Sequence, residues 1–160
     1  MNKMLNWVLA SLLLLATGCA TVSTQYNTME SMKTYVFDES AATVYEGAVA
    51  FFQSSRLPLK STGENTGVTS WKVGYKSQGS LSHNIKYRYT VATSTVNGNQ
   101  AIVRVTKETI PDDSDPLNIG KMLGSEMLTP DTMRDISFEF YILKQVNPAT
   151  AAEMEAAAAK

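Results

Sequence analysis

Cys19 carries the most reactive side chain in the sequence, and it is the only cysteine among the 160 residues. A thiol is a strong nucleophile near neutral pH, so this position is suited to covalent modification. Thr17 and Gly18 come directly before it, and their small side chains let a modifying enzyme approach the backbone. Because a lone cysteine cannot form an intramolecular disulfide, we expect Cys19 to carry an attached group rather than a structural bridge.

The segment before Cys19 has the features of an export signal. Lys3 supplies positive charge, and residues 5–16 form a mostly apolar run. This run is too short to span a hydrocarbon core, which needs about 20 apolar residues, but it suits a secretory signal closed by small residues. The alternative is a buried, inert cysteine at a fortuitous place, for which the charge, the run length and the small residues would be coincidences.

Residues 15–19, Leu-Ala-Thr-Gly-Cys, resemble the lipobox of bacterial lipoproteins, differing at Ala16, where that family usually has Leu. The resemblance implies that the Cys19 sulfur receives diacylglycerol and that a signal peptidase cuts between Gly18 and Cys19. The new amino group is then acylated, for example with palmitate. Since Ala20 stands where an inner-membrane retention signal has Asp, the resemblance also implies anchoring in the outer membrane, facing the periplasm.

The sequence predicts four segments. These are a signal peptide (1–18), a flexible tether (19–31), a single α+β domain (32–146) and an Ala-rich helical tail (147–160). The tether prediction depends on the polar, Ser- and Thr-rich residues that follow Cys19. A chain of this length suits one domain with its own core, and a formal net charge of −1 disfavours nucleic acid as a partner.

Other candidate chemistry is weak, so we predict neither catalysis nor a metal site. His83 is the only histidine, and one histidine cannot build a zinc site without further ligands. Acidic side chains at 112, 113 and 115 lack the Gly and terminal Glu of a calcium loop, so a solvated turn is favoured. Met122 and Met127 suit core packing or an adaptable contact surface better than soft-metal binding.

The clearest secondary-structure element that the sequence predicts is a helix over residues 41–56. Asp38 or Ser40 supplies its N-cap, and Pro58 limits its extension. The residues with the spacing of one helical face are Ala41, Tyr45, Ala48 and Phe52.

Alternating and β-branched residues predict five strands. They cover 33–37, 57–62, 68–75, 85–96 and 100–110, and residues 76–84 form a loop. In the last hairpin, Asn97-Gly98 favours a two-residue turn, but that register places an apolar face beside a polar one. A loop over residues 97–99 instead pairs Val91 with Val105, so burial selects this register unless a bulge compensates.

Residues 136–143 fit two periodicities. Ile136, Phe138 and Phe140 alternate as in a strand, whereas helical spacing connects Ile136, Phe140 and Leu143. The aromatic and β-branched content favours the strand. Before it we expect a short helix near residues 119–128, and after it a tail helix capped by Asn147, which buries almost nothing on its own.

Together these elements predict an α+β fold, an antiparallel sheet of five to six strands with one long amphipathic helix packed on one face. The pattern of residue types over residues 33–75 resembles the small α+β modules of outer-membrane assembly lipoproteins. It consists of Tyr-Val-Phe (35–37), the helix, Leu-Pro-Leu (57–59) and Thr-Gly-Val (66–68).

Two functions fit these observations. The first is a lipid-anchored interaction module, an accessory or structural subunit of a cell-envelope assembly with an envelope protein as partner. Its contact surface would include Met122, Met127 or Tyr141, or the C-terminal helix. The second is a carrier that binds a lipid or another small apolar ligand between helix and sheet, and a cavity there would reveal it. Bulky residues such as Trp71, Tyr75 and Phe52 are available to fill that space, which favours the first.

Overall fold

The computed structural model describes residues 23–78, 81–114 and 130–159. The described helices are an N-terminal helix (residues 23–32), α2 (Ala41–Ser54), α4 (Ile136–Val146) and α5 (Pro148–Ala158). The strands are β1 (Leu59–Gly63), β2 (Thr66–Thr69), β3 (Lys72–Gln78), β4 (Leu81–Asn97), β5 (Gln100–Pro111) and β6 (Asp131–Arg134).

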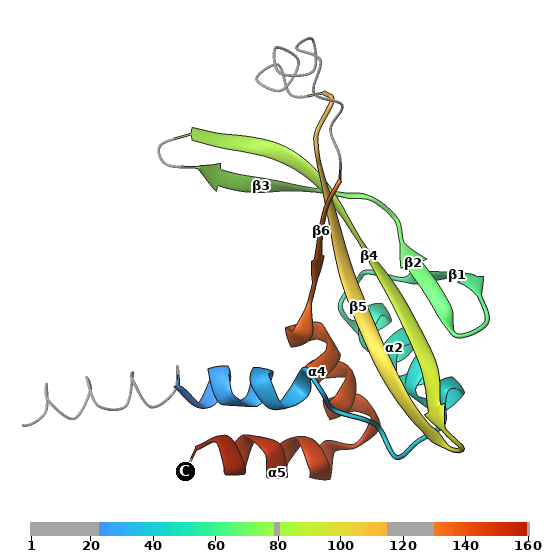
Figure 1. The fold of residues 1–160 in the computed structure, drawn as a ribbon. Coiled ribbons are helices and arrows are strands. Elements are labelled where there is room, and N and C mark those ends of the chain that lie inside the picture. Colours follow the sequence, from blue (N-terminus) through green and yellow to red (C-terminus); the bar gives the residue numbers. More distant parts are fainter. Residues whose placement is uncertain (1–22, 79–80, 115–129, 160) are drawn as a thin grey trace, which may run out of the picture.

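The strands form one six-stranded antiparallel sheet in the order β1-β2-β4-β5-β6, and β3 pairs with β4 beyond the end of β2 (Figure 1). Helices α2 and α4 both contact the sheet and each other, and α5 packs on α4. This is the predicted α+β class with an antiparallel sheet. The helical layer, however, is shared between several helices and is not one long helix.

Helix α2 is positioned as its sequence predicts. Ser40 is the N-cap, and its side-chain oxygen accepts a hydrogen bond from the Thr43 N–H at 3.2 Å. The helix ends at Ser54, and Arg56 then adopts a φ of 59°. Its buried residues are Ala41, Val44, Ala48 and Phe52.

The strand predicted for residues 136–143 is wrong, because this segment forms α4. Asp135 caps the helix by accepting a hydrogen bond from the Phe138 N–H at 3.1 Å. The helix buries Glu139, Phe140, Ile142 and Leu143 together. A strand would have pointed neighbouring residues to opposite faces, so it could not have buried Ile142 and Leu143 on the same side. The residues just before α4, Asp131–Arg134, form β6.

The β4–β5 hairpin has the register that burial selects. Val91 pairs with Val105 and Thr93 with Val103 along the ladder. Near the turn the register shifts, and Asn97 pairs with Gln100. A bulge therefore accommodates a two-residue turn over 98–99 while the rest of the hairpin keeps the predicted pairing.

The single strand predicted for residues 68–75 is divided into β2 and β3, and the loop predicted for 76–84 is mostly strand. The chain stops pairing with β4 after β2 and resumes at Lys72 with the register shifted by one residue. Odd-numbered residues therefore point to one face of the sheet in β2 and to the opposite face in β3. Thr69 is buried beneath the helices, whereas Trp71, Val73 and Tyr75 are exposed on the other side. Trp71 and Tyr75, which the sequence offers to fill the space between helix and sheet, are therefore not part of the core. The strand predicted for 33–37 contributes an isolated bridge between Phe37 and Ala101.

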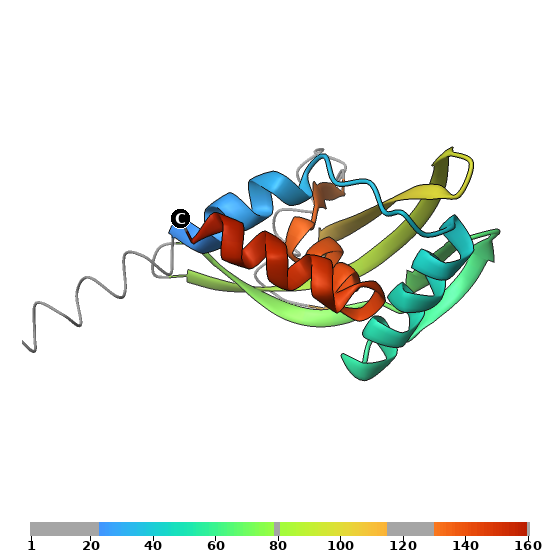
Figure 2. The same cartoon turned by 90° about the horizontal axis from the view of Figure 1, so that it is seen from below.

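The tether predicted for residues 19–31 is contradicted over the part described, because residues 23–32 form the N-terminal helix. Thr28 and Met32 are buried in it, each 2% exposed. The Asn27 side chain donates a hydrogen bond to the Ala158 carbonyl at 3.3 Å, so this helix lies beside α5 (Figure 2). Asn147 caps α5 as predicted, but α5 packs against its neighbours and buries Ala151.

The interface between helices and sheet is filled by aromatic rings from α2, α4 and β4. Tyr89 stacks on Phe138 with ring centroids 4.6 Å apart, and Phe52 contacts both rings edge-on at 5.7 and 5.4 Å. Phe51 adds a fourth ring, 5.3 Å from Phe138. Such contacts stabilise the domain beyond the burial of apolar area.

Burial, followed by the charges of Asp135 and Tyr87, raises the pKa of Tyr89 from 10.0 to about 12. Because the pKa of Tyr89 is raised in the folded state, the stability that its protonated form contributes is fully present below pH 10. This contribution is lost as the pH rises from 10 toward 12. We therefore expect Tyr89→Phe to lose less stability than the parent between pH 9 and pH 11.5, measured by urea unfolding. Parallel losses in the two proteins would contradict the assignment.

Candidate functional site

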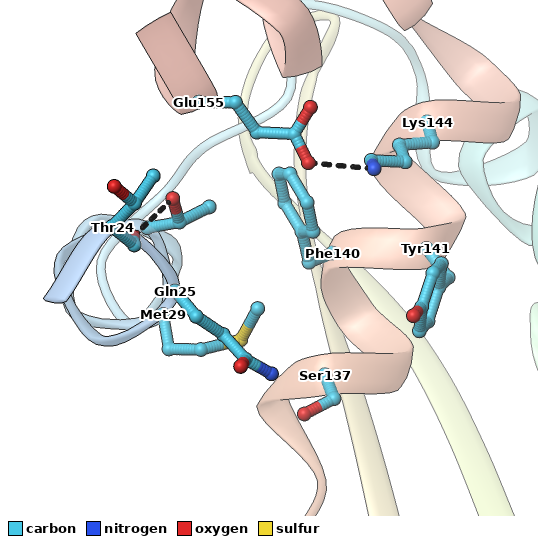
Figure 3. A pocket seen from close by; sticks show the side chains of 9 residues that line it. Thr24, Gln25, Met29, Ser137, Phe140, Tyr141, Lys144 and Glu155 are labelled. Atoms are coloured by element: carbon cyan, nitrogen blue, oxygen red, sulfur yellow. Dashed lines mark hydrogen bonds and ion pairs between the residues drawn. The ribbon is translucent and has the colours of Figure 1, made fainter. Parts of the chain in front are cut away.

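A groove of about 500 Å³ lies between the N-terminal helix, α4 and α5 (Figure 3). The N-terminal helix contributes one wall and α4 the other. The residues that line most of it are Gln25, Thr28, Met29, Phe140, Tyr141 and Lys144. Its surface is mainly apolar with a few polar groups, which is the usual character of a site that binds a small molecule or a side chain of a partner.

Two helices place the apolar part of the groove. Gln25 and Met29 extend from the N-terminal helix toward α4, and Phe140 extends from α4 into the space between them (Figure 3). Residues 25 and 29 are one helical turn apart and therefore share a face. Phe140 is 3% exposed, so its ring forms the floor of the groove rather than its rim.

An ion pair lies at the end of the groove next to α5. The Lys144 ammonium is 2.6 Å from the Glu155 carboxylate, and both side chains are partly exposed. The same ammonium lies 5.0 Å from the centre of the Phe140 ring, which is a favourable cation–π distance. Because the two charges compensate, this end of the groove favours an uncharged polar group over an ion.

Tyr141 is the one predicted contact residue whose position the structure describes. It lies on α4 at the groove, is 49% exposed, and stacks on Phe51 at 5.7 Å with an interplanar angle of 11°. Stacking holds the ring still, so it can serve as a preorganised contact. The other predicted site residues, Gly18, Cys19, Met122 and Met127, lie outside the described residues.

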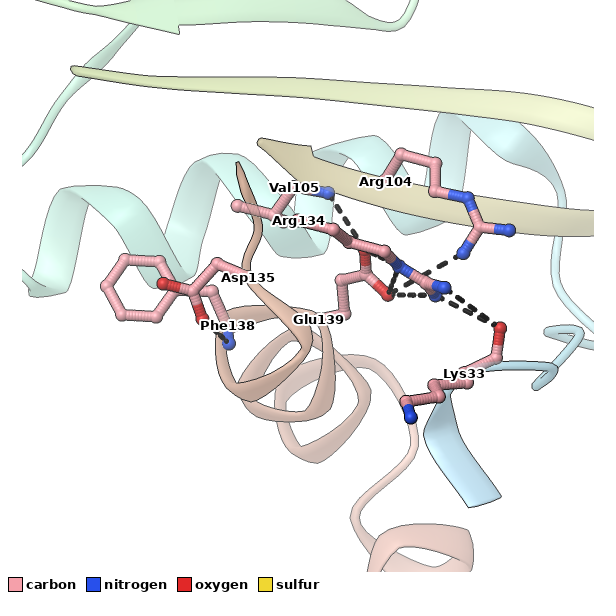
Figure 4. Close-up of polar contacts among 7 residues, drawn as sticks. All are labelled: Lys33, Arg104, Val105, Arg134, Asp135, Phe138 and Glu139. Atoms are coloured by element: carbon pink, nitrogen blue, oxygen red, sulfur yellow. Dashed lines mark hydrogen bonds and ion pairs between the residues drawn. The ribbon is translucent and has the colours of Figure 1, made fainter. Parts of the chain in front are cut away.

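A buried carboxylate fixes the N-terminal helix relative to the sheet (Figure 4). Glu139, on α4, is fully buried and accepts hydrogen bonds from the Val105 N–H at 3.0 Å and from Arg134 at 2.6 to 3.1 Å. Arg134 also donates to the carbonyl of Lys33, just after the N-terminal helix. The hydrogen-bonded carboxylate raises the pKa of Arg134 above its usual value. Sequence patterns missed this cluster, although an acidic residue within an apolar run was a possible indication of it.

The acidic side chains of Asp112 and Asp113, in the turn after β5, are bound by neighbouring residues of the domain. Asp112 accepts hydrogen bonds from the Ser114 N–H at 3.0 Å and hydroxyl at 2.8 Å, and these bonds, with Lys86, lower its pKa. Lys86 pairs with both Asp112 and Asp113. Within residues 23–78, 81–114 and 130–159, no group of three or more potential ligands is arranged to hold a metal ion.

None of the helices in the described ranges has the length and apolar character needed to cross a membrane. Comparisons of the chain with protein-family models, curated proteins and solved structures found no match.

Proposed function

We propose that this chain is a lipid-anchored interaction module of the bacterial cell envelope, an accessory or structural subunit that binds an envelope protein at the periplasmic face of the outer membrane. The observation that carries the proposal is the groove, an open and mainly apolar surface beside the N-terminal helix. Tyr141, which the sequence singles out as a contact residue, lines it together with Met29 and Phe140.

The position of the N-terminal helix strengthens this proposal. Four peptide steps separate Cys19 from the described residue 23, and an extended chain spans at most about 3.6 Å per residue. A lipid on Cys19 would therefore keep the start of the helix within about 14 Å of the anchored residue. Since Arg134 and Ala158 bind the end and the middle of this segment, the groove would be held near the bilayer in a restricted orientation.

The proposed anchor predicts that cells fed labelled palmitate incorporate it into the parent protein and not into Cys19→Ser. The thiol is the attachment point, and a hydroxyl is a much weaker nucleophile at neutral pH. Thr17→Ser keeps a small residue before the cysteine and should retain the label. Labelling that persists in Cys19→Ser would contradict the anchor.

The proposed contact predicts a single crosslinked partner. A photoreactive amino acid at Gln25 or Ser137, both at the groove, should give one reproducible adduct with an envelope protein, whereas the same amino acid at the distant, exposed Val96 should not. Removing the aromatic contact with Tyr141→Ser should lower the adduct yield about tenfold, which corresponds to losing about 1.4 kcal/mol of binding. Equal yields from all three positions would contradict a role for the groove.

The carrier function remains a second candidate because the groove volume falls within the range of about 300–1,000 Å³ typical of small-molecule sites. The aromatic rings occupy the space between helix and sheet, so a ligand would sit among the helices instead. Native mass spectrometry of protein extracted from membranes distinguishes the two functions. A co-purifying apolar molecule that is lost in Tyr141→Ser, together with scattered crosslinks, would favour the carrier.

A further inference from the structure

Strand β3 forms an edge of the sheet away from the groove. It pairs with β4 along residues 72–78, and no strand among the described residues pairs with its other side. Figure 1 shows the β3–β4 arm extending beyond the helices α2 and α4. An edge strand presents backbone N–H and C=O groups that can pair with another chain.

The outer face of β3 carries exposed apolar side chains. Val73 is 60% exposed and Tyr75 is 78% exposed, while Trp71, just before the strand, is 37% exposed. The guanidinium of Arg88 lies 4.6 Å from the centre of the Trp71 ring, so one face of this ring is covered. Apolar side chains gathered on one edge are characteristic of interaction sites rather than of an ordinary surface.

The opposite face of the same strand is positively charged. Lys72 and Lys76 flank Gly74, which lies close against the ring of Tyr87, and both lysines are exposed. Lys76 pairs with Asp131 at 3.9 Å, an exposed contact of little strength. The charges are therefore available to a partner.

The two lysines determine which kind of strand could pair with the free edge of β3. Antiparallel pairing of two copies about Gly74 would place Lys72 of one copy opposite Lys76 of the other. Like charges directly opposite destabilise a sheet, so this pairing of two copies is disfavoured. A strand that presents carboxylates opposite the lysines would be stabilised by the same rule.

We propose that β3 binds an extended segment of a partner protein in which apolar residues alternate with Asp or Glu. The added strand would pair with the β3 backbone, place its apolar side chains beside Val73 and Tyr75, and place its carboxylates beside Lys72 and Lys76. This surface is separate from the groove, and the inference does not depend on the proposed function.

The test uses the full chain and synthetic nine-residue peptides. One peptide alternates Val or Tyr with Glu, and a second has the same composition in an order without alternation. We expect the first to bind and to slow amide hydrogen exchange along β3. Lys72→Glu combined with Lys76→Glu should weaken binding at least about tenfold, and Tyr75→Thr should do the same. Lys60→Glu on the edge strand β1 and Val96→Thr are the matched controls and should bind as the parent does.

Three results would overturn the inference. Equal binding of both peptides, or exchange protection elsewhere than β3, would show that no ordered strand is added. If neither peptide protects β3, but the chain binds vesicles of phosphatidylethanolamine and phosphatidylglycerol with a dependence on Lys72, Lys76 and Tyr75, then the arm contacts lipid instead of protein.

Discussion

Arg134→Met is expected to lower the free energy of unfolding by about 3–5 kcal/mol, because it removes the cation that is hydrogen-bonded to a buried carboxylate. Glu139 is 0% exposed, and Arg134 supplies three of its hydrogen bonds. The same substitution removes both hydrogen bonds to the Lys33 carbonyl and so loosens the N-terminal helix. Urea unfolding followed by circular dichroism at pH 7 measures the loss.

Arg104→Met is the matched control. Arg104 approaches the same carboxylate at 3.9 Å but is 46% exposed, so its removal should cost less than about 1 kcal/mol. Arg134→Met combined with Glu139→Leu should recover part of the loss, since an apolar pair replaces the unpaired charge. A loss of less than 1 kcal/mol for Arg134→Met alone, as for the control, would show that the carboxylate does not need this partner.

Phe52→Ala is expected to destabilise the domain by a similar amount, about 3–5 kcal/mol, through the cavity that it leaves in the core. Phe52 is fully buried and touches the rings of Phe51, Tyr89 and Phe138. Since these rings come from α2, α4 and β4, they cannot close the cavity without moving secondary-structure elements. Thermal and urea unfolding should both report the change.

Tyr75→Ala removes a ring of similar size from an exposed position and should change stability by no more than about 0.5 kcal/mol. Phe52→Leu keeps most of the volume and should cost less than about 1.5 kcal/mol. If Phe52→Ala were no more harmful than Phe52→Leu, the aromatic cluster would not be the packed centre described above.

The elements that were predicted correctly depend on short-range patterns. Helix α2 has a cap and an apolar face within one segment, and the β4–β5 register follows from matching Val91 with Val105. Both are decided by residues that are close along the chain or directly opposed in a hairpin.

Helix α4 illustrates what local patterns leave undecided. Its residues fit both periodicities and their types favour a strand, but distant partners decide for the helix. Glu139 meets the backbone of Val105, and Gly47 on α2 leaves room for Val146, since a Cβ at that glycine would collide with it. Neither contact is visible in the sequence around residues 136–146.

The groove could be predicted only in part, because it is built from segments more than a hundred residues apart. Tyr141, which the sequence predicts as a contact residue, lines the groove, but Met29 and Gln25 lie in a segment predicted to be a tether. Their helix buries little except Thr28 and Met32, so its apolar pattern is too sparse to predict a helix. The N-terminal helix is held in place by its contact with α5, which the sequence around residues 23–32 does not reveal.

The hydrogen bond between Asn27 and Ala158 means that the C-terminal end of α5 lies beside the middle of the N-terminal helix. A short linker could therefore join the two helices, and the chain could be reopened at the exposed turn over 98–99 to give a circular permutant with the same core. A reporter domain fused after α5 would emerge beside the N-terminal helix and crowd it. The same reporter inserted at the turn would project from the other side of the molecule and leave both helices undisturbed (Figure 1).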